Sequence, residues 1–192
     1  LNIGFISGLN DSENLLFVPW WLEVIDRNRS GTLNGLRLWQ RYRQRHSQYR
    51  CFARMTIRDS LGTDAWIAPG EVNLMVAGHG ITHSERMDGP ARQAPQSLFG
   101  LQTWLALPKA HEDDPAAFHN APAAALPELG GEGKHLRLIL GHGWGERAPV
   151  PLHSETLYAD ATLAPHAALP LPDDHEDRGI YILKGEVTVA GQ

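Results

Sequence analysis

The chain has 192 residues, of which 42% are hydrophobic and 20% are charged, proportions typical of a soluble globular protein with one large domain or two small ones. Its net charge of -5 argues against an affinity of the whole surface for nucleic acid or anionic lipid. Cys51 is the single cysteine, which excludes a disulfide within the chain, and no run of about 18 apolar residues suggests a membrane span. We therefore expect a monomeric, cytoplasmic protein with no membrane anchor and no nucleic acid partner.

The first element expected along the chain is an apolar segment at residues 15–22. Pro19 interrupts it, so the edge or a bend of a sheet suits this segment better than a long central strand. The chain contains 19 glycines and 13 prolines between short apolar runs. This composition favours strands and turns over helices.

Residues 27–58 differ in composition from the rest of the chain. They hold nine of the fourteen arginines and no aspartate or glutamate, and four aromatic residues lie among them: Trp39, Tyr42, Tyr49 and Phe52. Arginine interleaved with aromatic rings is typical of surfaces that bind single-stranded nucleic acid. The segment has neither strand alternation nor a helical stripe, and a docking face for a protein partner is the second interpretation.

A hairpin is expected at residues 59–66, where Gly62 can take the positive φ that such a turn requires. The turn pair Pro69-Gly70 should lead into a strand at residues 72–76. Extended structure resumes at residues 81–86.

His83 and Glu85 lie two residues apart in this extended segment. Side chains at this spacing project from the same face of a strand, so the imidazole and the carboxylate would point together into whatever the sheet encloses. Both groups are common ligands of divalent metals. The pair is a candidate half of a metal site, although a histidine and a glutamate at this spacing also occur by chance on solvent-facing strands.

The middle of the chain is expected to separate two halves. Residues 88–97 are loop by composition, and residues 98–107 alternate as a strand. Residues 109–134 should form a linker, because their prolines limit any helix to short turns. The histidine and acidic residues at 111–114 are better explained by a solvated linker than by a metal site.

The second half should contain strands at residues 136–140 and 157–163, and a strand, turn and strand at residues 180–189. The glycine-rich run at residues 141–145 is expected to be a turn, since it lacks the spacing and the following helix of a phosphate-binding loop. We expect no metal site among three further histidines of this half: His153, His166 and His175.

Four stretches of the chain closely resemble the pirin family: Arg58-Asp59-Ser60-Leu61-Gly62, Pro69-Gly70-Glu71-Val72, the run from Ala77 to Arg86 and the run from Leu98 to Pro108. The resemblance is continuous from about residue 55 to residue 108. Pirins are bicupins, so it implies an all-β fold of two consecutive cupin β-barrels. The barrels would occupy residues 1–108, with residues 27–58 anomalous, and residues 135–192, with residues 109–134 as linker. The second barrel lacks the family's last strands, which means either a truncated sequence or an open barrel.

The resemblance also implies a site in the first barrel, where three histidines and one glutamate hold Fe(II) or another divalent metal. His83 and Glu85 match two of these metal ligands, and Glu85 is also the candidate catalytic residue. The family's His-Pro-His pair is absent, because Trp39 and Arg41 fall at its positions and neither is a ligand for a divalent cation. His46 could substitute only through a slip in the local register. Either the segment has diverged and lost the metal, or it is misread.

The activity that the resemblance implies is that of a quercetin 2,3-dioxygenase, an oxidoreductase that acts on a flavonol-like aromatic substrate. One alternative is a non-enzymatic regulator that senses the oxidation state of its metal and binds a protein partner. A metal-free relic is the other. The sequence does not choose among them, because a fold does not fix a function.

Overall fold

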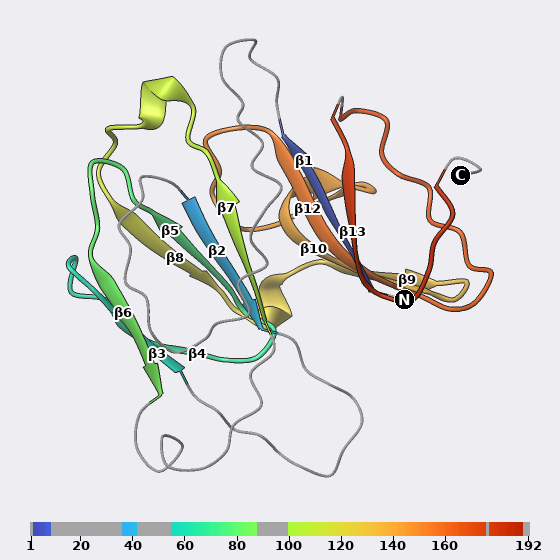
Figure 1. Ribbon diagram of the computed structural model, residues 1–192, viewed down its shortest axis with the longest axis horizontal. Helices are drawn as coiled ribbons and strands as arrows, with labels where there is room; N and C mark the ends of the chain where they lie inside the picture. Colours follow the sequence, from blue (N-terminus) through green and yellow to red (C-terminus); the bar gives the residue numbers. More distant parts are fainter. Residues whose placement is uncertain (1, 9–35, 42–54, 88–99, 176, 190–192) are drawn as a thin grey trace. The chain divides into compact units, whose positions relative to one another are not determined.

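The computed structural model describes residues 2–8, 36–41, 55–87, 100–175 and 177–189 (Figure 1). Two compact units make up the chain. The N-terminal unit is residues 18–123, and the C-terminal unit is residues 124–192 together with residues 1–17. Nearly all regular structure in the described residues is strand, so the all-β class is confirmed. The closure of the sheets into barrels stays a prediction.

Two antiparallel sheets form the N-terminal unit. One has the strand order β7-β2-β5-β8, and the other has the order β4-β3-β6. Their bounds are β2 (Leu36–Arg41), β3 (Met55–Asp59), β4 (Asp64–Ile67), β5 (Val72–Val76), β6 (His83–Met87), β7 (Gly100–Leu105) and β8 (Ala117–Ala121). The strands expected at residues 72–76 and 98–107 are confirmed as β5 and β7, the latter with shorter bounds.

The β3-β4 hairpin has the expected turn. Gly62 adopts φ 89°, a region that costs glycine little and other residues more. The Asp59 carboxylate accepts hydrogen bonds from the backbone N–H groups of Leu61 (2.9 Å) and Thr63 (3.0 Å). This arrangement explains why an aspartate opens the turn, since a short acidic side chain can bind the backbone a few residues on.

The hydrophobic core of the N-terminal unit is formed by residues of β3, β4 and β5 and of the loop between β5 and β6. Its buried residues are Met55, Ile57, Ile67, Met75, Ala77 and Ile81. Every residue of β5 is buried, including the polar Asn73, whose side-chain oxygen accepts a 2.8 Å hydrogen bond from Asn120 on β8. This bond offsets part of the cost of burying an amide beside the apolar cluster.

One antiparallel sheet forms the C-terminal unit, in the order β11-β10-β12-β1-β13, with β9 paired to β10. Its strands are β1 (Asn2–Gly8), β9 (Glu128–Gly131), β10 (Lys134–Gly143), β11 (Glu146–Arg147), β12 (Thr156–Leu163) and β13 (Gly179–Lys184). The first strand of the chain therefore lies between β12 and β13 and pairs with both. The domain boundaries expected from the sequence remain a prediction, but this pairing assigns residues 2–8 to the C-terminal unit.

Alternate residues of β12 pack into the core of the C-terminal unit. The buried members of this cluster are Leu136, Leu138, Ala148, Leu157, Ala159, Ala161 and Leu163. Full burial of one leucine side chain stabilises a fold by roughly 1.5–3 kcal/mol, so this cluster is a principal source of stability for the sheet.

Several segments differ from the sequence-based expectations. Strands β8 and β9 lie inside residues 109–134, where a linker was expected. Strand β10 continues through Gly141 and Gly143, so the turn there is confined to Trp144-Gly145. Residues 186–189 form no strand. The segments at residues 15–22 and 88–97 lie outside the described residues.

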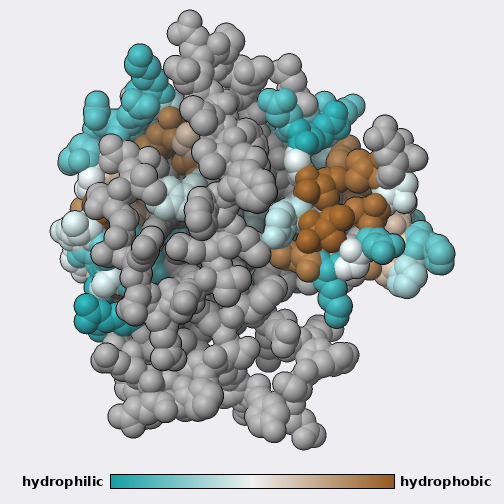
Figure 2. Space-filling model, viewed as in Figure 1, coloured by the Kyte–Doolittle hydropathy of each residue, from teal (hydrophilic) through white to brown (hydrophobic). Residues whose placement is uncertain are grey.

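Apolar side chains are exposed near β13, which is an edge strand of the C-terminal sheet among the described residues. Figure 2 shows hydrophobic residues gathered over this part of the unit, and Tyr181 and Ile182 on β13 are exposed. No helix in the described ranges has the length and apolar character that crossing a membrane requires.

Candidate functional site

His83 and Glu85 lie on β6, on the face that turns toward the core. Strand β6 pairs with β3, which places Glu85 opposite Ile57 and His83 opposite Asp59. Directly opposed residues of antiparallel strands project to the same side of the sheet, and Ile57 is fully buried in the core cluster. The histidine and glutamate side chains are accordingly only 16% and 14% exposed.

The two side chains are close enough to share a ligand. Nε2 of His83 lies 3.9 Å from Oε1 of Glu85. Nitrogen and oxygen donors bind divalent metals such as zinc at about 2.0–2.2 Å, so an ion between these atoms could contact both. The structure thus brings together the two residues expected as ligands, and their metal-binding role stays a prediction.

The positions of the family's other ligand pair lie on a different sheet. Trp39 and Arg41 belong to β2, which pairs with β5 and β7 and not with β6. His46 is outside the described residues. The described residues therefore match two of the four ligand positions that the resemblance implies, and the fit to that metal is partial.

His79 has a structural role in the loop before β6. Its backbone N–H donates to the carbonyl oxygen of Asp114, and its ring Nδ1 lies 3.2 Å from the same oxygen. A side chain at Gly78 would collide with that carbonyl, so the glycine permits the close approach. These contacts account for His79 without a metal.

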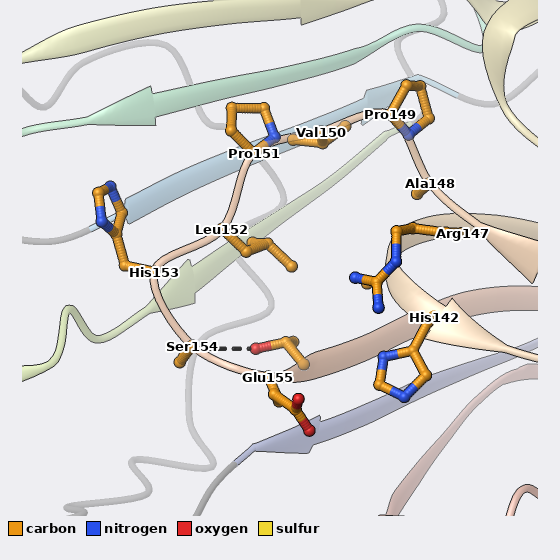
Figure 3. A pocket seen from close by; sticks show the side chains of 12 residues that line it. His142, Arg147, Ala148, Pro149, Val150, Pro151, Leu152, His153, Ser154 and Glu155 are labelled. Atoms are coloured by element: carbon orange, nitrogen blue, oxygen red, sulfur yellow. Dashed lines mark hydrogen bonds between the residues drawn. The ribbon is translucent and has the colours of Figure 1, made fainter.

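The C-terminal unit contains a cavity that the sequence did not suggest (Figure 3). Its volume is about 560 Å³, and the strand ends and loops around β11 line it. The charged and imidazole side chains of the lining are His142, Arg147, His153 and Glu155. The cavity thus joins polar groups with the apolar side chains of the Pro149–Leu152 segment.

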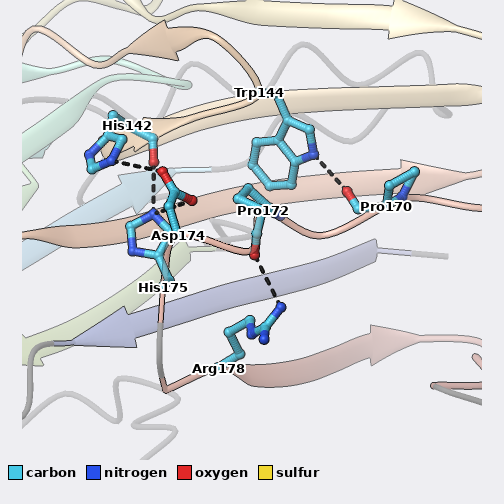
Figure 4. A network of polar contacts seen from close by, with 7 residues as sticks. All are labelled: His142, Trp144, Pro170, Pro172, Asp174, His175 and Arg178. Carbon is cyan, nitrogen blue, oxygen red and sulfur yellow. Dashed lines mark hydrogen bonds and ion pairs between the residues drawn. The ribbon is translucent and has the colours of Figure 1, made fainter.

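A second group of potential metal ligands adjoins this cavity through His142 (Figure 4). His142 Nε2 lies 3.2 Å from one carboxylate oxygen of Asp174, and His175 Nε2 lies 3.7 Å from the other. The two imidazole rings are 5.0 Å apart between centroids. Sequence reasoning missed this group because His142 and Asp174 are 32 residues apart and no local spacing connects them.

Asp160 is a buried residue of the C-terminal unit whose carboxyl pKa lies far above its ordinary value. It lies on β12 opposite Arg137, is 7% exposed, and burial raises its pKa to about 7. Arg137 does not neutralise it, because the guanidinium donates two hydrogen bonds to Glu128 on β9 and lowers the pKa of that carboxyl instead. Oδ1 of Asp160 has no hydrogen-bond partner within the part of the chain that the structure describes.

Comparisons with known proteins show which proteins this chain resembles in sequence. Residues 49–105 match the family model described as Pirin. Over 139 residues the chain is 41% identical to a pirin-like protein of Caulobacter vibrioides, a match that covers 72% of this chain and 48% of that protein. A putative quercetin 2,3-dioxygenase of Pseudomonas aeruginosa is 38% identical over 136 residues, which cover 70% of this chain and 41% of the relative.

A solved structure has the same fold over much of the chain. The crystal structure of quercetin 2,3-dioxygenase from Acinetobacter baumannii matches with a TM-score of 0.58 at 22% identity, over 68% of this chain and 43% of that one. At this identity the likeness concerns the fold alone. The chain spans about half the length of the curated relatives it matches. With the family match at residues 49–105 and the all-β fold, these similarities establish that the chain belongs to the pirin family.

Proposed function

We propose that the N-terminal unit binds a divalent metal, Fe(II) in the first instance, through His83 and Glu85. The observation that supports this proposal is the 3.9 Å separation of an imidazole nitrogen and a carboxylate oxygen on one largely buried face of β6. A neutral imidazole and a carboxylate suit a divalent iron ion, whereas soft thiolates favour other metals. The negative charge of Glu85 would also offset part of the charge of the cation.

The affinity for the metal should be weak if these two residues are its whole protein ligand set. Catalytic metal sites commonly have three protein ligands, and two ligands compete poorly with water and chelators. A third donor would have to come from outside the described residues, where His46 is a candidate. Peptide mass spectrometry of residues 27–58 tests whether the missing pair is present after all.

For the whole protein we propose dioxygenation of a flavonol-like aromatic substrate. The Pseudomonas relative is described as a putative quercetin 2,3-dioxygenase, which supports this choice of substrate. A metal bound at the site would supply activation of the substrate's oxygen atoms and of O2. His83 and Glu85 would hold the ion, and the neighbouring core would shield their inner face from water.

Metal content and oxygen consumption test this function together. The purified chain is loaded with Fe(II) without oxygen, its iron is measured by elemental analysis, and O2 uptake is followed after addition of quercetin. His83→Ala should remove metal and turnover together. Glu85→Gln keeps the shape of the side chain but deletes its charge, so we expect metal affinity to fall about tenfold or more.

His79→Ala is the matched control, because this exposed histidine contacts Asp114 and lies outside the proposed ligand pair. It should retain iron and activity. Turnover that survives both His83→Ala and Glu85→Gln would show that the site is wrong. Full metallation without flavonol turnover would exclude the dioxygenase while leaving the metal site in place.

A further inference from the structure

We propose that His142, Asp174 and His175 form a second metal site, specific to the C-terminal unit, that binds a first-row divalent ion such as Zn²⁺ or Fe²⁺. The site shares no residue with the pair on β6 and does not depend on the function proposed above. It consists of two imidazoles and one carboxylate, whose candidate ligand atoms all lie within 4.8 Å of one another.

The distances between donors suit a metal with small adjustments. Donors that each lie about 2.0–2.2 Å from an ion are separated from one another by about 3–4 Å. The two carboxylate-imidazole distances, 3.2 Å to His142 and 3.7 Å to His175, are in this range. Burial is graded across the group, since His175 is 6% exposed, His142 is 25% exposed and Asp174 is 52% exposed. The carboxylate can therefore move to close the site while the imidazoles stay fixed.

The loop that carries Asp174 and His175 contacts the C-terminal end of β10 and the turn that follows it. The loop residues that make these contacts precede the two ligands in the sequence. The indole N–H of Trp144 donates to the carbonyl oxygen of Pro170 at 2.8 Å. Pro172 lies next to Gly143, since a Cβ built on the glycine would be in ordinary contact, 3.4 Å, with the proline ring. These contacts hold the loop beside His142 through protein groups alone, which reduces the ordering cost of binding a metal.

A third contact lies within the loop itself. Arg178, which follows the two ligands in the sequence, donates a 3.1 Å hydrogen bond to the carbonyl oxygen of Pro172, which precedes them. Trp144 itself adopts φ 51°, an unusual conformation for a bulky residue. Its indole is packed against the core of the unit, which holds the β10-β11 turn in place.

His175 must exchange one interaction to bind a metal through Nε2. This nitrogen lies 3.2 Å from the carbonyl oxygen of His142, a hydrogen bond that coordination would replace. Loss of a neutral hydrogen bond of this kind lowers the affinity for the metal by about tenfold at most. The gain from coordinating an imidazole can exceed this loss.

The ligand set indicates the class of ion and leaves room for a further ligand. Two histidines and one carboxylate with open positions are typical of catalytic zinc and of non-haem iron, and a hard ion such as Mg²⁺ would prefer an all-oxygen set. His142 also lines the 560 Å³ cavity, which gives the ion a route to solvent. The same three side chains could instead serve as a hydrogen-bond network that ties the loop to β10, and the test must separate these roles.

The test compares two neighbouring carboxylates on this loop. Cobalt(II) is titrated into the full chain and followed by its visible d–d absorption, and zinc(II) binding is measured by calorimetry. Asp174→Asn should lower the affinity of one ion per chain by tenfold or more. Asp173→Asn, which changes an exposed carboxylate outside the ligand group, should leave binding unchanged. The same comparison in a chain that also carries His83→Ala removes the contribution of the N-terminal site.

A readout of stability distinguishes ligation from a structural role. Saturating zinc should raise the thermal midpoint of the wild-type chain and of Asp173→Asn, and should raise that of Asp174→Asn much less. His142→Gln is the second variant, since it alters a partly exposed ligand while the buried His175 is kept. Equal cobalt affinity of Asp174→Asn and Asp173→Asn would overturn the proposal. So would a wild-type chain that binds no cobalt, because a hydrogen-bond network alone predicts that result.

Discussion

Replacement of Asp160 by asparagine should change how the stability of the protein depends on pH. The carboxyl group is 7% exposed, and burial raises its pKa to about 7 from an ordinary value of 3.8. In the unfolded chain the group loses its proton near the lower value, whereas the folded protein keeps it almost to neutrality. The folded state therefore binds more protons between about pH 4 and pH 7, and its stability falls as the pH rises through this window.

The size of the effect follows from the shift. A pKa raised by about three units corresponds to at most about 4 kcal/mol, at 1.36 kcal/mol per unit. Wild-type protein has this stability in full below about pH 4 and loses it by about pH 8. The asparagine side chain cannot ionise, so the free energy of unfolding of Asp160→Asn, relative to wild type, should rise across the same interval by a similar amount. The comparison between pH values cancels the constant cost of burying the amide.

Urea unfolding followed by tryptophan fluorescence at pH 4.5, 6 and 8 measures this difference. Asp173→Asn is the control, because Asp173 is exposed and its replacement should give a difference that is independent of pH. The burial argument fails if Asp160→Asn differs from wild type by the same free energy, within about 0.5 kcal/mol, at pH 4.5 and pH 8.

Three further predictions concern the C-terminal sheet. Gly141→Ala should destabilise the protein by about 2 kcal/mol or more, because the new Cβ would collide with the carbonyl oxygen of Thr156 and the backbone φ is 73°. In Gly145→Ala the new Cβ meets open space, so this variant should lose about 1 kcal/mol of stability from its φ of 81° alone. Chemical denaturation of both variants checks this order. Leu138→Ala, at a fully buried core position, should lower the unfolding free energy by about 2–5 kcal/mol in the same assay. Deletion of residues 1–8 should expose amides of β12 and β13 to hydrogen exchange, and full protection in the deletion variant would contradict the pairing of β1.

The all-β class and the β3-β4 hairpin could be predicted because each depends on residues that are close together in the sequence. Gly62 must take a positive φ and Asp59 can bind the following backbone, so the turn follows from a few neighbouring residues. The common face of His83 and Glu85 follows in the same way from the period of a strand. Their inward direction could not be read from spacing alone, because it depends on Ile57 in the paired strand.

The parts that could not be predicted depend on contacts between distant residues. The run from Gly141 to Gly145 looks like one turn, but Gly141 and Gly143 continue the strand and allow Thr156 and Leu157 to pack closely against them. His175 lies beside His142, and no spacing in the sequence indicates this contact. Strand β8 was missed for a related reason, since its pairing with β5 outweighs the weak strand signal of Ala117–Ala121.

The position of β1 also determines the order in which the protein can be assembled. In the sequence this strand precedes the N-terminal unit, whereas both of its partners, β12 and β13, follow that unit. During translation β1 can therefore pair with β12 only after the whole N-terminal unit has been synthesised. Contacts of such long sequence separation slow folding and prolong the exposure of strand edges. The C-terminal unit is consequently the later of the two to fold, and no single cut in the chain can release it with its sheet complete.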